Sequence, residues 1–140
     1  MDINLCRIEN LPRIADARGN LSFVEGPTLV PFDIQRVYYL YDVPGGADRG
    51  AHAHKALHQL MIALSGAFEV ELDDGKRKKT IRLDRAYRGL YICPMIWRTL
   101  QNFSSGAVCL VLASERYDEA DYIRDYDAFL ELARRPGTCA

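Results

Sequence analysis

The sequence predicts an all-β fold: a jelly-roll barrel (double-stranded β-helix) with one short C-terminal helix. Turn residues recur every eight to twelve positions, and the apolar segments between them are short and rich in Val, Ile and Tyr, which is typical of a β-sandwich or barrel. Asp74-Gly75 separates two of these segments and favours a tight β-hairpin. Apolar residues recur at helical spacing only after Ser114.

Ten segments are expected to form strands. Apolar and acidic residues alternate from Phe68 to Asp73, so this strand should have one face in water. The apolar runs 60–64 and 108–113 are continuous, which indicates strands buried on both faces, as in a core or a dimer interface. The predicted strands are Leu5–Ile8, Gly19–Glu25, Val37–Tyr41, Gly50–Lys55, Gln59–Ser65, Ala67–Leu72, Lys79–Leu83, Gly89–Ile92, Arg98–Phe103 and Val108–Ala113.

The length of 140 residues suits one domain with one core, residues 1–140. Its last element is expected to be a helix over about Asp125 to Ala133, which Asp125 caps and Pro136-Gly137 ends, with a tail over 134–140. Barrels of this kind often expose one large apolar sheet face. A homodimer is therefore expected.

Composition argues against several classes of function. The net charge of −1 creates no overall field that attracts nucleic acid or anionic lipid, and the basic run 76–79 is expected to be a solvated hairpin tip. No apolar run approaches a membrane span, and the first residues lack a basic patch followed by an apolar stretch. The four cysteines form no CxxC pair and are expected to be reduced. We therefore expect a cytoplasmic protein that binds neither nucleic acid nor membrane.

One motif carries most of the information about chemistry. It runs from Gly46 through His52-x-His54 and Gln59 to Gly66, and it has the spacing of the metal-binding box of a cupin barrel. Side chains alternate along a strand, so both imidazoles point to the same side. A cupin metal box has a glutamate at the position of Gln59.

The second cupin box has a Pro followed by a His, with an Asn four residues beyond that His. Here Pro94 leads to Arg98, and Asn102 lies four residues on. Arginine keeps its proton and cannot donate a lone pair to a metal. Because two of four ligands are replaced, we expect no metal and no cofactor. The two histidines are then free to take and return a proton, since an unperturbed imidazole titrates near pH ~6.5.

Four arginines indicate an anion site. Arg18, Arg36, Arg49 and Arg98 each adjoin a strand or turn that can face the barrel mouth. Together with the two histidines they predict a site for an anion such as a diphosphate. Trp97, beside Arg98, either walls this site or fills the core.

Tyrosines can stack on a base or bond a sugar, and two of them are neighbours on one predicted strand. Tyr38 and Tyr39 must face opposite sides of that strand. Only one of them can therefore serve the site, and the other only packs.

Longer segments carry a resemblance to a known family. They are Asp16–Gly19, Pro31–Tyr39, Arg49–Lys55, Leu72–Gly75, Gly89–Tyr91, Pro94–Trp97 and Leu112–Arg124. In these segments the chain resembles the dTDP-sugar 3,4-ketoisomerases, small WxcM-like cupins that also occur fused to acetyltransferases in bacterial surface-sugar pathways. The likeness spans nearly the full length, and the segments 49–55 and 117–124 are more specific than the general cupin boxes.

The resemblance implies a metal-free homodimer that converts dTDP-4-keto-6-deoxy-D-glucose into its 3-keto isomer. The product would supply 3-amino-3,6-dideoxyhexose biosynthesis for the O-antigen of lipopolysaccharide or another glycan. His52 or His54 would remove the proton at C3, and the other histidine would support it or shuttle a proton. Tyr38 would bond the oxygens of the enediolate intermediate. Arg49 and Arg36 would hold the diphosphate.

Two positions depart from the family pattern, and three alternatives remain. One branch of the family pairs Arg with His at the positions of Arg18 and Arg98, and the other pairs Tyr with Arg. This chain has Arg at both positions, so no configuration at C4 is predicted. The alternatives are a metal-dependent cupin that uses His52 and His54, a metal-free 3,5-epimerase of the same substrate, and a non-catalytic sugar-nucleotide-binding cupin.

Overall fold

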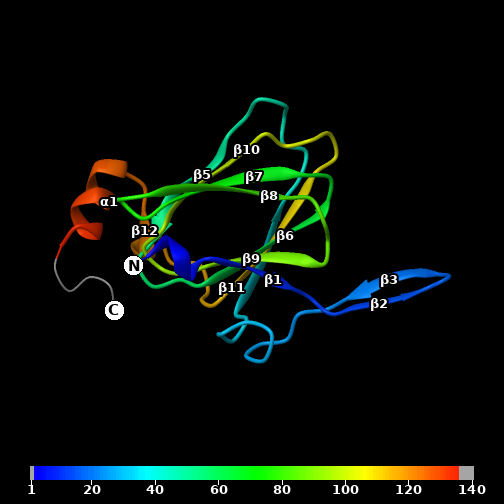
Figure 1. Cartoon of the computed structure of the whole chain (residues 1–140). Helices are drawn as coiled ribbons and strands as arrows, with labels where there is room; N and C mark the ends of the chain where they lie inside the picture. The colour runs from blue at the N-terminus through cyan, green and yellow to red at the C-terminus, as the bar shows by residue number, and fades with distance from the viewer. Residues whose placement is uncertain (1, 136–140) are drawn as a thin grey trace.

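The computed structural model describes residues 2–135. Two five-stranded antiparallel sheets face each other and enclose the interior of a barrel (Figure 1). The first sheet contains, in spatial order, β1 (Arg7–Asn10), β9 (Arg88–Ile92), β6 (Gln59–Ser65), β11 (Val108–Ala113) and β4 (Arg36–Leu40). The second contains β12 (Tyr122–Ile123), β5 (Arg49–His54), β10 (Trp97–Gln101), β7 (Phe68–Asp73) and β8 (Lys78–Leu83).

Strands that are far apart in the sequence lie side by side in both sheets. Strand β6 lies between β9 and β11, and β10 lies between β5 and β7. Interleaving of this kind defines a jelly roll. The predicted fold class is therefore confirmed.

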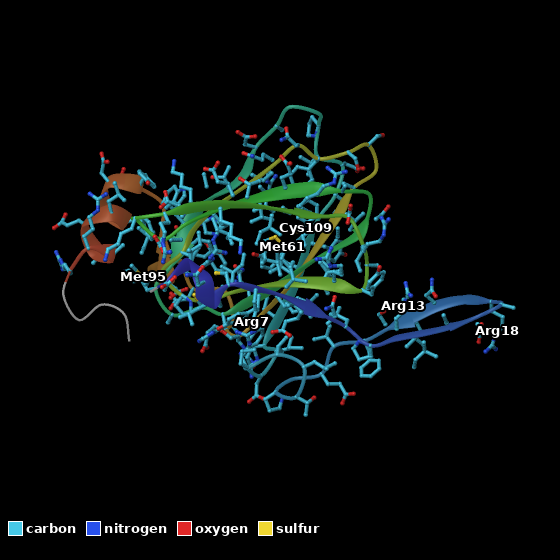
Figure 2. The ribbon with its side chains drawn as sticks, in the orientation of Figure 1. Arg7, Arg13, Arg18, Met61, Met95 and Cys109 are labelled. Carbon is cyan, nitrogen blue, oxygen red and sulfur yellow. The ribbon has the colours of Figure 1, made fainter. Side chains whose placement is uncertain are left out.

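The continuous apolar runs fill the centre of the first sheet. Met61 and Cys109 point into the barrel, where Figure 2 shows their side chains between the two sheets. Ile62, which lines a groove on the outer face, is only 2% exposed. Burial on both faces, predicted for these two strands, is thus confirmed. Leu64 at the end of β6 is an exception, with 48% of its surface exposed.

A separate hairpin projects from the barrel (Figure 1). It consists of β2 (Arg13–Asp16) and β3 (Gly19–Ser22), and every residue in it is exposed. Gly19 follows the turn with φ +129°, a value that a residue with a side chain rarely adopts. A two-stranded hairpin is at best marginally stable by itself in water.

The C-terminal helix α1 (Tyr126–Ala133) agrees with its prediction. Asp125 caps it, because its side chain accepts a hydrogen bond from the backbone N–H of Ala128 at 3.0 Å. Phe129 is fully buried against the ring of Trp97. The expected helix stop at Pro136-Gly137 lies outside the described residues. Within residues 2–135, no helix has the length and hydropathy to cross a membrane.

The strand predictions are accurate in the barrel and wrong near the N-terminus. The eight strands expected between residues 37 and 113 all form, with bounds within two residues of prediction. Residues 3–5 instead form a 3-10 turn, η1 (Ile3–Leu5), because the Asp2 side chain accepts a hydrogen bond from the N–H of Asn4. Strand β3 ends at Ser22, which pairs with Arg13, the first residue of β2. The short strands β2 and β12 were not predicted.

Candidate active site

A cavity of about 270 Å³ lies inside the barrel, between β4, β5, β10 and β11. Its apolar wall includes Met61, Leu100 and Val111. Its polar groups converge from four strands and the segment after β12, and they are Tyr38, Arg49, His52, Arg98, Tyr122 and Arg124. An apolar cavity with a few convergent polar groups is the usual form of a small-molecule site.

A β-bulge in β5 directs residues into this cavity. Arg98 pairs with His52 and Leu100 pairs with Arg49, so β5 has one residue more than β10 over this stretch. Gly50 takes up the irregularity with φ +74°, and an added Cβ would lie 3.0 Å from Leu100. Arg49 and Gly50 consequently both line the cavity, which neighbours on a regular strand cannot do.

The two histidines of β5 form a hydrogen-bonded pair. Nε2 of His52 lies 3.1 Å from Nε2 of His54, with the rings perpendicular. Nδ1 of His54 lies 3.0 Å from Oδ2 of Asp121. The ring of Tyr122 covers both imidazoles, at 5.0 Å from His52 and 4.4 Å from His54. His52 lines the cavity, whereas His54 is fully buried behind it.

Both imidazoles are neutral at physiological pH. Burial lowers the pKa of His52 to about 3 and the pKa of His54 to about 2, and the positive charge of Arg98 acts in the same direction. A neutral imidazole has a free lone pair and can accept a proton. The pair can therefore act as a base without first losing a proton.

A second chain of hydrogen bonds begins at Arg98. This guanidinium is 1% exposed, and its hydrogen bonds go to neutral acceptors, the carbonyl of Ile96 and Oε1 of Gln59. Nε2 of Gln59 donates in turn to the hydroxyl of Tyr38 at 2.7 Å. Burial raises the pKa of Tyr38, against the opposing charge of Arg98. The phenol therefore stays protonated and can still donate its O–H into the cavity.

The residues present do not suit a metal. A cupin metal needs a carboxylate next to the two imidazoles, but the amide oxygen of Gln59 already accepts a hydrogen bond from Arg98. A buried guanidinium at this point repels a second cation. Within residues 2–135, no group of three or more His, Cys, Asp or Glu side chains is arranged to hold a metal ion.

A larger cavity of about 1010 Å³ adjoins the barrel mouth. Tyr122 lines both cavities. Arg36 and Arg116 contribute positive charge to the larger one, and the guanidinium of Arg36 lies over the rings of Tyr38 and Tyr117. Nε of Arg36 is buried, and it has no hydrogen-bond partner within residues 2–135. Four acidic side chains line the same cavity, those of Asp33, Glu115, Asp118 and Asp121, so its lining is mixed in charge.

Two residues expected in the site lie elsewhere. Arg18 lies at the tip of the projecting hairpin (Figure 2), where its side chain is 90% exposed and pairs with Asp16. Trp97 packs on Tyr126 and Phe129 beneath α1. Since Arg98 points into the barrel, the preceding residue must point out. The structure thus places Trp97 beneath α1, and it does not bring Arg18 to the cavity of its own chain.

Sequence reasoning did not assign Asp121 to the site. It lies 67 residues from His54 in the chain, so no spacing rule connects the two. The signal was the segment 117–124, which carries much of the family resemblance. The 3-10 turn η2 (Glu119–Asp121) and β12 place Asp121 here, because Tyr122 pairs with His54.

The neutral histidine pair predicts how stability depends on pH. Each ring gains a proton on unfolding below pH ~6.5, so the unfolded chain binds more protons and the free energy of unfolding falls as pH falls. Between pH ~6 and ~5 the pair should contribute a slope of up to about 2.7 kcal/mol per pH unit. Urea unfolding at a series of pH values measures this slope.

The matched variant His52→Asn removes one titrating ring and should lose about half of that contribution. A free energy of unfolding that stays constant from pH 7 to 5 would contradict neutral imidazoles in the folded chain.

Comparison with known proteins identifies the family. Residues 4–134 match the family described as "FdtA: WxcM-like, C-terminal". A TDP-4-oxo-6-deoxy-alpha-D-glucose-3,4-oxoisomerase from Aneurinibacillus thermoaerophilus is 46% identical over 123 residues, which cover 88% of each chain.

Two solved structures are similar over nearly their whole length. A mutant of the 3,4-ketoisomerase QdtA from Thermoanaerobacterium thermosaccharolyticum, in complex with TDP-4-keto-6-deoxyglucose, is 42% identical with a TM-score of 0.93, covering 98% of this chain and 99% of that one. The TDP-quinovose 3,4-ketoisomerase WlaRB from Campylobacter jejuni is 50% identical with a TM-score of 0.88, covering 92% and 99%. The chain described above, with its jelly roll and paired histidines, belongs to the WxcM-like family of sugar 3,4-ketoisomerases.

Proposed function

We propose that this protein is an isomerase that converts dTDP-4-keto-6-deoxy-D-glucose into a dTDP-3-keto-6-deoxyhexose. The observation that carries the proposal is the neutral His52–His54 pair, which lies beside a cavity that also holds a buried cation. Keto–enol isomerisation needs a base for a carbon-bound proton and a donor for the developing oxyanion. Both kinds of group are available at this cavity, so general acid–base chemistry can proceed there.

His52 is the proposed base. The proton at C3 of the substrate is acidic because C3 adjoins the C4 carbonyl. His52 faces the cavity, whereas His54 lies behind it and contacts His52. His52 takes the C3 proton, an enediolate forms, the hydroxyl proton moves between O3 and O4, and a proton is delivered to C4. The carbonyl is then at C3, and no group has been gained or lost.

Tyr38 and Arg98 are proposed to stabilise the enediolate. The Tyr38 hydroxyl accepts from Gln59, so its own proton is free to point at a substrate oxygen. The charge of Arg98 has only neutral hydrogen-bond partners, so it favours a negative charge in the cavity. Fixed charges and donors in a site that excludes water are worth more than in solution.

The nucleotide is proposed to occupy the larger cavity. The substrate would then extend past Tyr122, which lines both cavities, with its sugar inside the barrel and its diphosphate at the mouth. Arg36 is proposed to bind the diphosphate there, because it lines this cavity and its Nε has no hydrogen-bond partner within residues 2–135. Arg49 lines the inner cavity and is proposed to bind the sugar-proximal phosphate.

A homodimer is proposed for two reasons. Ile14 and Leu21 on the projecting hairpin are 59% and 56% exposed, and Val37 and Leu64 on the barrel are 52% and 48% exposed. A groove of about 740 Å³ between the hairpin base and the outer face of the first sheet is lined mainly by apolar residues. A second copy of the chain would cover these surfaces. In this dimer, Arg18 of one copy is proposed to contact the substrate that is bound to the other copy.

We further propose that the enzyme acts in the cytoplasm, on a route to 3-amino-3,6-dideoxyhexoses for O-antigen or another glycan. The thiols of Cys6, Cys93 and Cys109 support this location, since they are buried and unpaired by disulfides. The product is a ketone, which an aminotransferase can consume.

The proposed reaction predicts exchange with solvent. Incubation of the protein with dTDP-4-keto-6-deoxy-D-glucose in deuterated water should give a 3-keto product that carries ring deuterium, because the C4 proton comes from a group that exchanges with solvent. NMR of the product measures both features.

Tyr38→Phe should lower kcat by about 100- to 1000-fold, as expected for the loss of one oxyanion donor.

Tyr39→Phe is the matched control, since Tyr39 is the next residue on β4 and is 59% exposed. Its kcat should equal that of the wild type. Absence of both exchange and 3-keto product would defeat the proposal. A product that keeps the 4-keto group would indicate an epimerase, and tight dTDP binding without exchange would indicate a binding protein.

The proposed interface predicts a dimer that a charge can break. Sedimentation equilibrium should show a wild-type dimer, and Leu64→Asp should shift it toward monomer, since burial of an unpaired carboxylate is costly. Leu5→Asp is the matched control, because Leu5 is equally exposed, at 48%, but lies outside this groove. A wild-type monomer, or equal dissociation of both variants, would contradict the interface.

A further inference from the structure

The carboxylate of Asp121 is held by two contacts at the outer end of the histidine pair. Its Oδ1 accepts a hydrogen bond from the backbone N–H of Ala56 at 2.8 Å, and its Oδ2 lies 3.0 Å from Nδ1 of His54. The side chain is only 17% exposed. A backbone contact also ties the two segments, because the N–H of Lys55 donates to the carbonyl of Asp121 at 2.9 Å.

These contacts determine where the protons of the histidine pair lie. A carboxylate only accepts hydrogen bonds, so Nδ1 of His54 carries the proton that Asp121 receives. His54 is neutral, so its Nε2 has a lone pair and no proton. The hydrogen bond between the two rings is then donated by Nε2–H of His52. Nδ1 of His52 is left with a free lone pair, and it makes no hydrogen bond within residues 2–135.

We propose that Asp121 is a positioning residue for the isomerisation: through His54 it fixes the tautomer of His52, and so keeps one nitrogen of His52 unprotonated and ready to take the proton from the sugar. The inference rests on the proposed function for its kinetic consequence only. The arrangement of protons along Asp121, His54 and His52 is a property of the protein without substrate. Asp121 also stabilises the positive charge that the pair acquires when His52 is protonated.

The variant Asp121→Asn tests this role. An asparagine can still accept the N–H of Ala56, but its NH₂ group now donates to Nδ1 of His54. The proton of His54 moves to Nε2, and His52 can no longer donate its Nε2–H to this ring. We expect kcat to fall about 100- to 10,000-fold, as for a misplaced tautomer in other acid–base sites.

A spectroscopic measurement separates positioning from a merely structural role. Long-range ¹H–¹⁵N correlation spectra of histidine-labelled protein distinguish Nδ1–H from Nε2–H rings. Wild-type His54 should be the Nδ1–H tautomer, and Asp121→Asn should convert it to Nε2–H. Asp125→Asn is the matched control: it makes the same change of charge four residues away, at the cap of α1, and should alter neither the tautomer nor kcat.

Each result bears on the inference. Wild-type kcat in Asp121→Asn, or lost activity with the His54 tautomer unchanged, would overturn it. If the variant does not fold, the wild-type spectrum decides alone, since an Nε2–H tautomer of His54 would overturn the inference. A wild-type protein that shows the expected tautomers but no turnover would defeat the proposed reaction and leave the proton arrangement intact.

Discussion

The burial of Arg98 against Gln59 is the interaction on which the site depends. Removal of a guanidinium from water costs several kcal/mol, and hydrogen bonds offset part of that cost. Because the acceptors are the neutral Gln59 amide and the Ile96 carbonyl, the positive charge remains. Burial is the larger cause of the low pKa values of His52 and His54, and the charge of Arg98 lowers them further. A carboxylate at position 59 would have neutralised this charge.

Two hydrogen-bond chains of opposite charge meet at one cavity. The cationic chain runs from Arg98 through Gln59 to Tyr38, and the anionic chain runs from Asp121 through His54 to His52. The first ends in a donor and the second ends in an acceptor, which are the two groups that an enolisation requires. Most members of both chains lie on strands of the barrel, so the sheet register holds their separation.

Local patterns in the sequence were sufficient to predict the barrel strands. They also predicted that His52 and His54 point to the same side, because side chains alternate along a strand. Alternation also predicts that Trp97 points away from the cavity, since Arg98, the next residue on the strand, points into it. Contacts made only by tertiary folding could not be predicted in this way. Asp121 reaches His54 because the two-residue strand β12 pairs with β5, and Arg18 lies at the tip of the projecting β2–β3 hairpin, away from the cavity of its own chain.

The central claim is that proton transfer in this barrel depends on its own side chains, with Arg98 in place of a metal ion. The most direct test is metal analysis of protein purified without added metal, combined with turnover measured before and after exhaustive chelation. We expect far less than one metal ion per chain and an unchanged rate, since Gln59 and Arg98 occupy two of the four ligand positions of the cupin metal site. Stoichiometric iron, nickel or zinc, with activity that is lost on chelation and restored by that metal, would contradict the account.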